Sequence, residues 1–182
     1  TGSGSLVMRA GYDNNYATPG VVAGIGTIDL AATLSFASST VSLIAGNTVQ
    51  QNSSTPGSIT AANLLAGAGN SVLLDLAPNN VGTLAGLANN QFRFLNGPSL
   101  TIGSVGGIDG VTVSSNNPAT IDISVASGAN LVMTNLYGGY GYGHIIKNGS
   151  GTLEVTGTLW SNKGGQSTGF NITNGTVIPK TD

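Results

Sequence analysis

The chain has 182 residues, of which only 12 are charged: five Lys or Arg and seven Asp or Glu. That 7% charged fraction compares with roughly 25% in an ordinary soluble domain, while 40% of the residues are hydrophobic. Such a chain can bury a core, so disorder along its whole length is excluded. A net charge of −2, with the cations scattered over Arg9, Arg93, Lys147, Lys163 and Lys180, gives no basic patch and argues against nucleic-acid binding.

The absence of cysteine excludes disulfides and thiolate metal sites. No apolar run reaches the roughly 18 residues of a membrane helix, so we expect no membrane span in this segment. The first residues, TGSGSLVMRA, do not form a signal peptide, and we expect any export signal to lie upstream. No cofactor-binding motif is present, and we expect no cofactor.

Short segments with alternating apolar and polar residues follow one another along the chain, separated by Gly, Asn and Ser. Val, Ile and Thr are plentiful and helix formers are scarce, which favours strands. The stretch 59–68 comes nearest to a helical pattern, but its glycines argue against a stable helix. The predicted strands are 5–10, 26–32, 39–45, 70–77, 91–96, 99–105, 120–126, 130–136, 151–160 and 170–179.

Four acids occupy the middle of an aliphatic–acid–aliphatic triplet and are therefore predicted to point outward from their strands. The triplets are Ile28–Asp29–Leu30, Leu74–Asp75–Leu76, Ile121–Asp122–Ile123 and Leu153–Glu154–Val155. Asp29 and Asp75 are 46 residues apart (75 − 29), and Asp75 and Asp122 are 47 apart (122 − 75). Two coils of roughly 23 residues each would give this spacing and would place the three aspartates on one face, about two strand separations apart.

Two all-β architectures fit these strands: a parallel β-solenoid and, as the alternative, an antiparallel β-sandwich. Asn-Gly pairs at 96–97, 148–149 and 174–175 allow local hairpins. The solenoid accounts better for the low charge, the Asn/Gly/Ser/Thr corners and the shortage of large aromatic residues. We therefore predict that residues 1–182 form one solenoid segment of a longer repetitive protein.

Three stretches carry a family resemblance: GYDNNYATPG with GTIDLAA, SITAANLLAGAGNSVLLDLAPNNVGTLAG, and FRFLNGPSLTIGSVGGIDGVTV. They resemble repeats of the filamentous-haemagglutinin family, which are large secreted bacterial exoproteins and adhesins. The later KNGSGTLEVTGTLWSNKGGQSTGFNITNGTVIP is similar to the strand repeat of autotransporter passengers. Together these stretches cover most of the chain. The resemblance implies a right-handed parallel β-helix displayed outside the cell, and it brings no catalytic residues with it.

The run YGGYGYGH, residues 137–144, is the clearest candidate for binding. Tyr137, Tyr140, Tyr142 and His144 would form an aromatic surface for a sugar or a partner protein. The interpretation that we favour for this run, however, is a glycine-rich turn between two strands. His144 is the only histidine, so it cannot assemble a zinc site, and no G-x-S-x-G motif provides a nucleophile.

The outward acids raise an enzyme hypothesis, since glycosidases use two carboxylates about 5–9.5 Å apart. Asp75 and Asp122, two coils apart, would lie at or beyond that limit, and a solvated face explains them better. Calcium binding through Asp109 in GGIDG is a weaker alternative, because the tandem repeats of calcium-binding β-rolls are missing.

The sequence therefore predicts a non-enzymatic structural or adhesive segment of a bacterial secreted or surface-displayed protein, self-associating into fibres or along a longer rod. The alternative is a module that binds carbohydrates or host and environmental surface glycans. A polysaccharide-cleaving enzyme is the third hypothesis.

Overall fold

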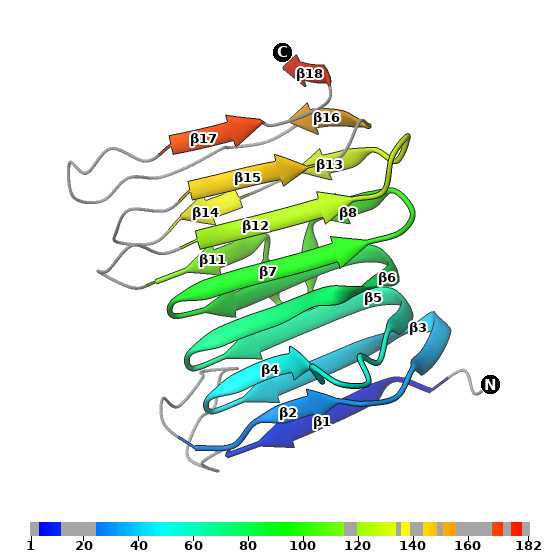
Figure 1. The fold of residues 1–182 in the computed structure, drawn as a ribbon, viewed down its shortest axis with the longest axis vertical. Helices are drawn as coiled ribbons and strands as arrows, with labels where there is room; N and C mark the ends of the chain where they lie inside the picture. Colours follow the sequence, from blue (N-terminus) through cyan, green and yellow to red (C-terminus); the bar gives the residue numbers. More distant parts are fainter. Residues whose placement is uncertain are drawn as a thin grey trace.

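The computed structural model describes residues 4–11, 25–114, 120–133, 136–138, 144–148, 151–155, 169–172 and 176–179. Within these ranges the chain is all-β, with strands stacked along the long axis of the molecule (Figure 1). No helix in the described part is long and apolar enough to cross a membrane. The strands are β1 (Leu6–Ala10), β2 (Ile28–Leu30), β3 (Leu34–Ala45), β4 (Thr48–Gln51), β5 (Ile59–Ala68), β6 (Ser71–Ala88), β7 (Gln91–Asn96), β8 (Leu100–Ile102), β9 (Ser104–Val105), β10 (Ile108–Asp109), β11 (Val111–Val113), β12 (Thr120–Val125), β13 (Leu131–Met133), β14 (Leu136–Gly138), β15 (His144–Asn148), β16 (Thr152–Val155), β17 (Gly169–Ile172) and β18 (Thr176–Pro179).

Sixteen strands form one parallel sheet made of two ladders. Ladder A contains β1, β3, β5, the second half of β6, and then β8, β11, β13, β14, β16 and β18. Ladder B contains β2, β4, the first half of β6, and then β7, β12, β15 and β17. The chain passes repeatedly from one ladder to the other, and β6 belongs to both. Among the described strands only β9 and β10 pair antiparallel, so the alternative of an antiparallel sandwich is wrong.

A short sequence repeat marks the corners at which the chain passes from ladder A to ladder B. The segments are AGNTV (45–49), AGNSV (68–72) and ANNQF (88–92). The backbone N–H of Asn70 donates to the carbonyl of Asn47, and that of Asn89 donates to the carbonyl of Asn70. Asn and Gly suit corners because their backbones adopt turn conformations readily. These corners lie one above another and keep the two ladders in register.

The core lies between the ladders and consists of side chains that alternate along each strand. In ladder B, one inward row is Ile28, Val49, Val72, Phe92 and Ile121, with none more than 5% exposed. The largest of these, Phe92, packs opposite Gly86 of ladder A. A Cβ built on Gly86 would lie only 2.5 Å from Cε2 of that ring. The glycine therefore makes the room that the aromatic side chain occupies.

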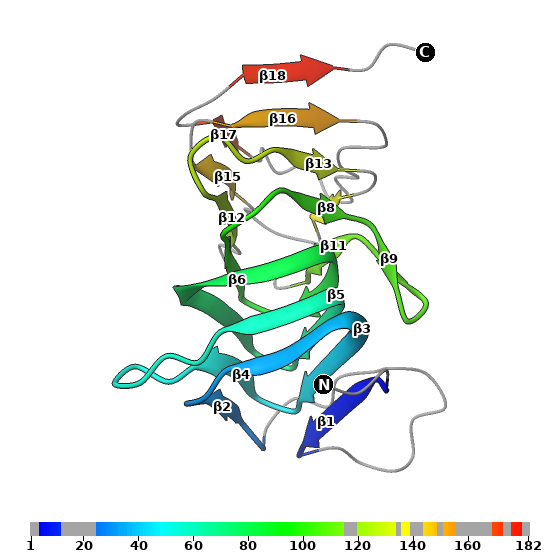
Figure 2. The same ribbon diagram turned by 90° about the vertical axis from the view of Figure 1, so that its right-hand side faces the viewer.

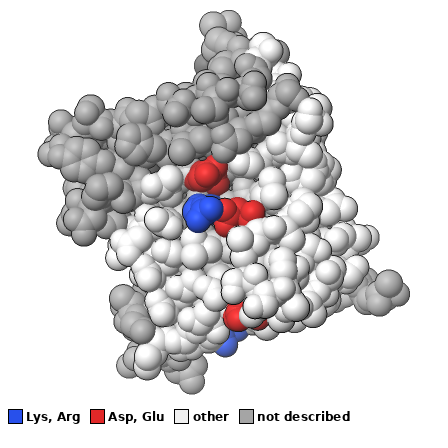
Figure 3. Space-filling view, viewed as in Figure 1, with Lys and Arg blue, Asp and Glu red and all other residues white. Residues whose placement is uncertain are grey.

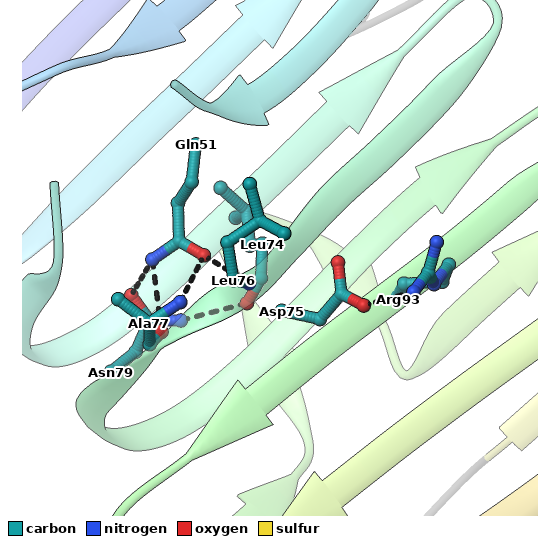
Figure 4. A network of polar contacts seen from close by, with 7 residues as sticks. All are labelled: Gln51, Leu74, Asp75, Leu76, Ala77, Asn79 and Arg93. Atoms are coloured by element: carbon teal, nitrogen blue, oxygen red, sulfur yellow. Dashed lines mark hydrogen bonds and ion pairs between the residues drawn. The ribbon is translucent and has the colours of Figure 1, made fainter. Parts of the chain in front are cut away.

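Three buried amides support the opposite corner, where the chain leaves ladder B. Gln51, Asn79 and Asn96 are 2%, 1% and 0% exposed. The side chain of Asn79 accepts a hydrogen bond from the backbone N–H of Ile59 (2.9 Å) and donates to two backbone carbonyls. Figure 4 shows the amide of Gln51 beside the backbone of Leu76 and Ala77. Its Oε1 accepts hydrogen bonds from the N–H groups of Leu76 (2.8 Å) and Ala77 (3.0 Å). Each amide satisfies backbone groups that the corner takes out of the ladder.

The β9–β10 hairpin interrupts a strand of ladder A without breaking its hydrogen bonds. The N–H of Gly103 donates to the carbonyl of Leu84, and the N–H of Gly86 donates to the carbonyl of Gly110. Figure 2 shows the hairpin projecting beside the stacked strands. Val105 covers a second apolar cluster, outside the main core, that contains Ile44, Leu65 and Ala85.

The alternation in the predicted strands is mostly confirmed, with one error and several omissions. Ile28, Leu30, Ile121 and Ile123 are buried, as expected. Leu76 is 53% exposed, because the pairing of β6 with β7 shifts register between Leu74 and Asn79 as the chain leaves ladder B. The segment 99–105 divides into β8 and β9, and the segment 170–179 divides into β17 and β18. The segment 59–68 is a strand, and β4, β10, β11, β14 and β15 were not predicted.

Candidate functional site

The run YGGYGYGH begins in ladder A and ends in ladder B. Tyr137 lies in β14 of ladder A, where its Cα pairs with Thr112. His144 begins β15 of ladder B, where its Cα pairs with Thr120 and Gly169. Tyr140 and Tyr142 lie outside the described residues. The two described ends of the run therefore lie in different ladders, and the proposed aromatic surface stays a prediction.

The outer face of ladder B carries a cluster of charged side chains near the middle of the molecule (Figure 3). Asp75 of β6 forms an ion pair with Arg93 of β7. In the parallel pairing of β7 with β12, Arg93 lies next to Asp122 in the register. In a chain with so few charges, the sheet brings three of them together from three adjacent strands.

Exposure and charge differ among the members of this cluster. The side chain of Arg93 is 43% exposed and that of Asp75 is 19% exposed. The pKa of the Asp122 carboxyl is raised, mainly because the group is partly buried. The charge of Asp75 also raises this pKa, whereas the charge of Arg93 and a hydrogen bond with Ser124 lower it. The two carboxyl groups therefore have different environments, which sequence reasoning did not anticipate.

A single register row runs through this face. The Cα partners, one strand after another, are Asp29, Gln50, Leu73, Arg93 and Asp122. We call these five residues the outer row. Its four strand steps cover about 19 Å at the usual strand separation.

The predicted spacing of the aspartates is confirmed in strand steps but not in register. Asp75 lies two strands from Asp29 and two strands from Asp122, and those two steps correspond to the expected pairs of coils. However, Asp75 follows Leu73 by two residues, so it lies beside the outer row and not in it. All three acids lie on the outer side of ladder B, since the residue before each of them, Ile28, Leu74 or Ile121, is buried.

Asp29 is held at the other end of the outer row by amide side chains. Asn52 Nδ2 donates to one carboxylate oxygen at 2.7 Å, and Gln50 Nε2 approaches the other at 3.4 Å. Asn52 Oδ1 also accepts from the backbone N–H groups of Ser54 and Thr55, both at 3.0 Å. This end of the row is therefore a fixed set of carboxylate and amide groups at the surface.

The arrangement can bind hydroxyl groups, because it offers acceptors at both ends and a guanidinium donor between them. It is less suited to glycoside hydrolysis, because β7 and its Arg93 lie between the strands of the two acids. Among the described residues there is no group of three or more His, Cys, Asp or Glu that could hold a metal ion. Asp109 lies in the β9–β10 hairpin, where it accepts a 2.6 Å hydrogen bond from Ser104.

Sequence reasoning missed Arg93 and Gln50 as members of this face. Arg93 had a usable signal, since it stands between Phe92 and Phe94 as each acid stands between two aliphatics. Gln50 had none, because a Gln-Gln pair does not reveal which amide is buried.

Comparison with protein-family models, with curated proteins and with solved structures finds no match to this chain.

Proposed function

We propose that the chain is a segment of a right-handed parallel β-solenoid that serves as a non-enzymatic structural rod in a bacterial secreted or surface-displayed adhesin or extracellular filament. The observation that supports this most is the pair of parallel ladders around an apolar interior. Parallel strands joined by crossovers are right-handed in nearly all known cases. Such a rod resists unfolding because each added strand extends both the hydrogen bonds and the core.

The rod self-associates end to end in this proposal. At one end, β1 pairs with β3 and β2 pairs with β4. Among the described strands β1 and β2 are therefore the outermost, and their outer edges offer backbone groups for pairing. Val7 of β1 is 55% exposed, and Ile25 before β2 is 80% exposed. At the other end, β17 is the last described strand of ladder B and β18 is the last described strand of ladder A, and both pair in parallel with the strand before them. A second copy stacked on this end would therefore continue both ladders.

Low charge favours this association, since little electrostatic repulsion opposes contact between copies. The outer face of ladder A is covered in part by the β9–β10 hairpin, which leaves the ends as the better contact.

Sedimentation velocity over a concentration series, with electron microscopy of the same samples, tests the proposal. We expect growth into rods of constant width, with a reflection near 4.8 Å along the rod axis. Met8→Lys, which places a charge against the core in β1, should stop growth, whereas Thr101→Lys on the outer face of ladder A should not. A monomer at every concentration would contradict self-association.

A further inference from the structure

We propose that the outer row of ladder B is a binding site for a neutral polysaccharide that lies along the axis of the molecule. The inference goes beyond the structural role above and does not depend on self-association. It rests on what the row presents to solvent: a carboxylate, an amide, an aliphatic side chain, a guanidinium and a second carboxylate, in that order.

The spacing suits an extended polymer. Successive members of the outer row are one strand apart, so polar groups recur at about 4.8 Å over about 19 Å. A linear polymer can follow this row from strand to strand. Leu73, half-buried in the middle of the row, offers an apolar contact for the C–H face of a sugar ring.

The charge of the face selects against acidic polymers. Asp29, Asp75 and Asp122 lie on or beside the outer row, and the guanidinium of Arg93 is already paired with Asp75. A uronate or sulfate chain would be repelled by the carboxylates, and nucleic acid would be repelled for the same reason. Neutral hydroxyls, which both donate and accept hydrogen bonds, match carboxylates and guanidinium alike.

The groups are also held in place before a ligand arrives. The ion pair orients Arg93, and the hydrogen bonds from Gln50 and Asn52 orient Asp29. Because the side chains project from a continuous hydrogen-bonded ladder, little ordering entropy is lost on binding.

The test measures binding of the whole chain to soluble polysaccharides by isothermal titration, with dextran, laminarin and hydroxyethyl cellulose as neutral probes and polygalacturonate and heparin as acidic ones. We expect at least one neutral probe to bind and the acidic probes to bind at least tenfold more weakly. Arg93→Gln and Gln50→Ala should each weaken neutral binding about tenfold or more, since each removes hydrogen bonds to the ligand.

Thr101→Ala is the matched control, because Thr101 lies at a half-buried position on ladder A, away from the outer row. It should leave binding unchanged. Gln50→Ala keeps the test decisive if Arg93→Gln fails to fold, which thermal unfolding would reveal. The proposal is overturned if no neutral probe binds, if acidic probes bind as tightly, or if the control variant loses as much affinity as the outer-row variants. The titrations are run at protein concentrations at which sedimentation velocity shows no rods, so none of these readings depends on whether rods form.

Discussion

The pairing of Gly86 with Phe92 makes a sharp test of how the core is packed. Gly86→Ala adds one methyl group at a position where the ring of Phe92 and a backbone carbonyl already lie close. The added Cβ would be 2.4 Å from the carbonyl oxygen of Ala66 and 2.5 and 2.8 Å from two ring carbons. Ala66 belongs to the neighbouring strand, so its carbonyl cannot move without loosening the ladder.

The expected cost follows from two opposing effects. Overpacking a close-packed core costs about 1–3 kcal/mol. Replacing glycine by alanine at an extended position returns about 0.4–1 kcal/mol, because the unfolded chain loses conformational freedom. We therefore expect a net loss of about 1–2 kcal/mol in the free energy of unfolding. In a chain of this length that corresponds to a melting temperature lower by roughly 2–8 °C.

Urea unfolding followed by circular dichroism measures this loss, and a double-mutant cycle identifies its cause. Phe92→Leu removes the ring atoms that crowd the new methyl group, so it should cost less in the Gly86→Ala background than in the wild type, by at least about 0.5 kcal/mol. Gly97→Ala serves as the control, since its Cβ would meet nothing closer than 3.4 Å. The reasoning fails if Gly86→Ala is as stable as the wild type, or if Phe92→Leu costs the same in both backgrounds.

Three further predictions concern polar groups and the hairpin. Asn79→Leu should lower the free energy of unfolding by about 2–5 kcal/mol in urea titrations, because it leaves three backbone groups, at buried or partly buried positions, without their hydrogen bonds. Asp122→Asn should change the pH dependence of stability. Because burial raises the pKa of this carboxyl in the folded protein above its ordinary value of 3.8, the wild type is favoured below that pH and loses stability as the pH rises through the folded value. The variant should therefore gain stability relative to the wild type as the pH rises, and an unchanged difference across the series would refute this. Val105→Ser should cost about 1–2 kcal/mol in thermal unfolding by uncovering the second apolar cluster, without changing the parallel sheet seen by infrared spectroscopy.

Much of the fold could be predicted because alternation in single strands reports which side chains face inward. The segment 91–96 matches β7 at both ends, and 120–126 exceeds β12 by one residue. The pattern fails where the chain leaves a ladder. Leu76 follows the alternation in sequence, but the register shift before Asn79 turns it outward. The sequence of segment 59–68 resembles that of a helix, because Ala and Gly occupy positions where the core has little room. The segment is a strand because it pairs with β3 on one side and β6 on the other.

The charged face could be predicted only in part. Alternation places Asp29, Asp75 and Asp122 outside, but their relative register depends on coil lengths of 21, 23, 20 and 29 residues between successive members of the outer row (50 − 29, 73 − 50, 93 − 73, 122 − 93). Their mean is close to the predicted 23, while the individual values are not visible without the pairing. The buried amides Asn79 and Asn96 read as surface residues in the sequence, since only the closed corner reveals that they are needed inside.

The base of the β9–β10 hairpin makes the protein a natural scaffold for peptide display. The N–H of Gly110 donates a hydrogen bond to the carbonyl of Gly103 (3.0 Å), and both glycines are also hydrogen-bonded to the neighbouring strand β6. The hydrogen bonds of ladder A therefore continue across the base of the hairpin, residues 103–110. Val105 and Ile108 of the hairpin pack on the second apolar cluster, so added length belongs in the turn between Gly106 and Gly107. A foreign loop spliced between these two glycines should therefore be carried at a defined height on the molecule, held at both ends, with the register of every other strand unchanged.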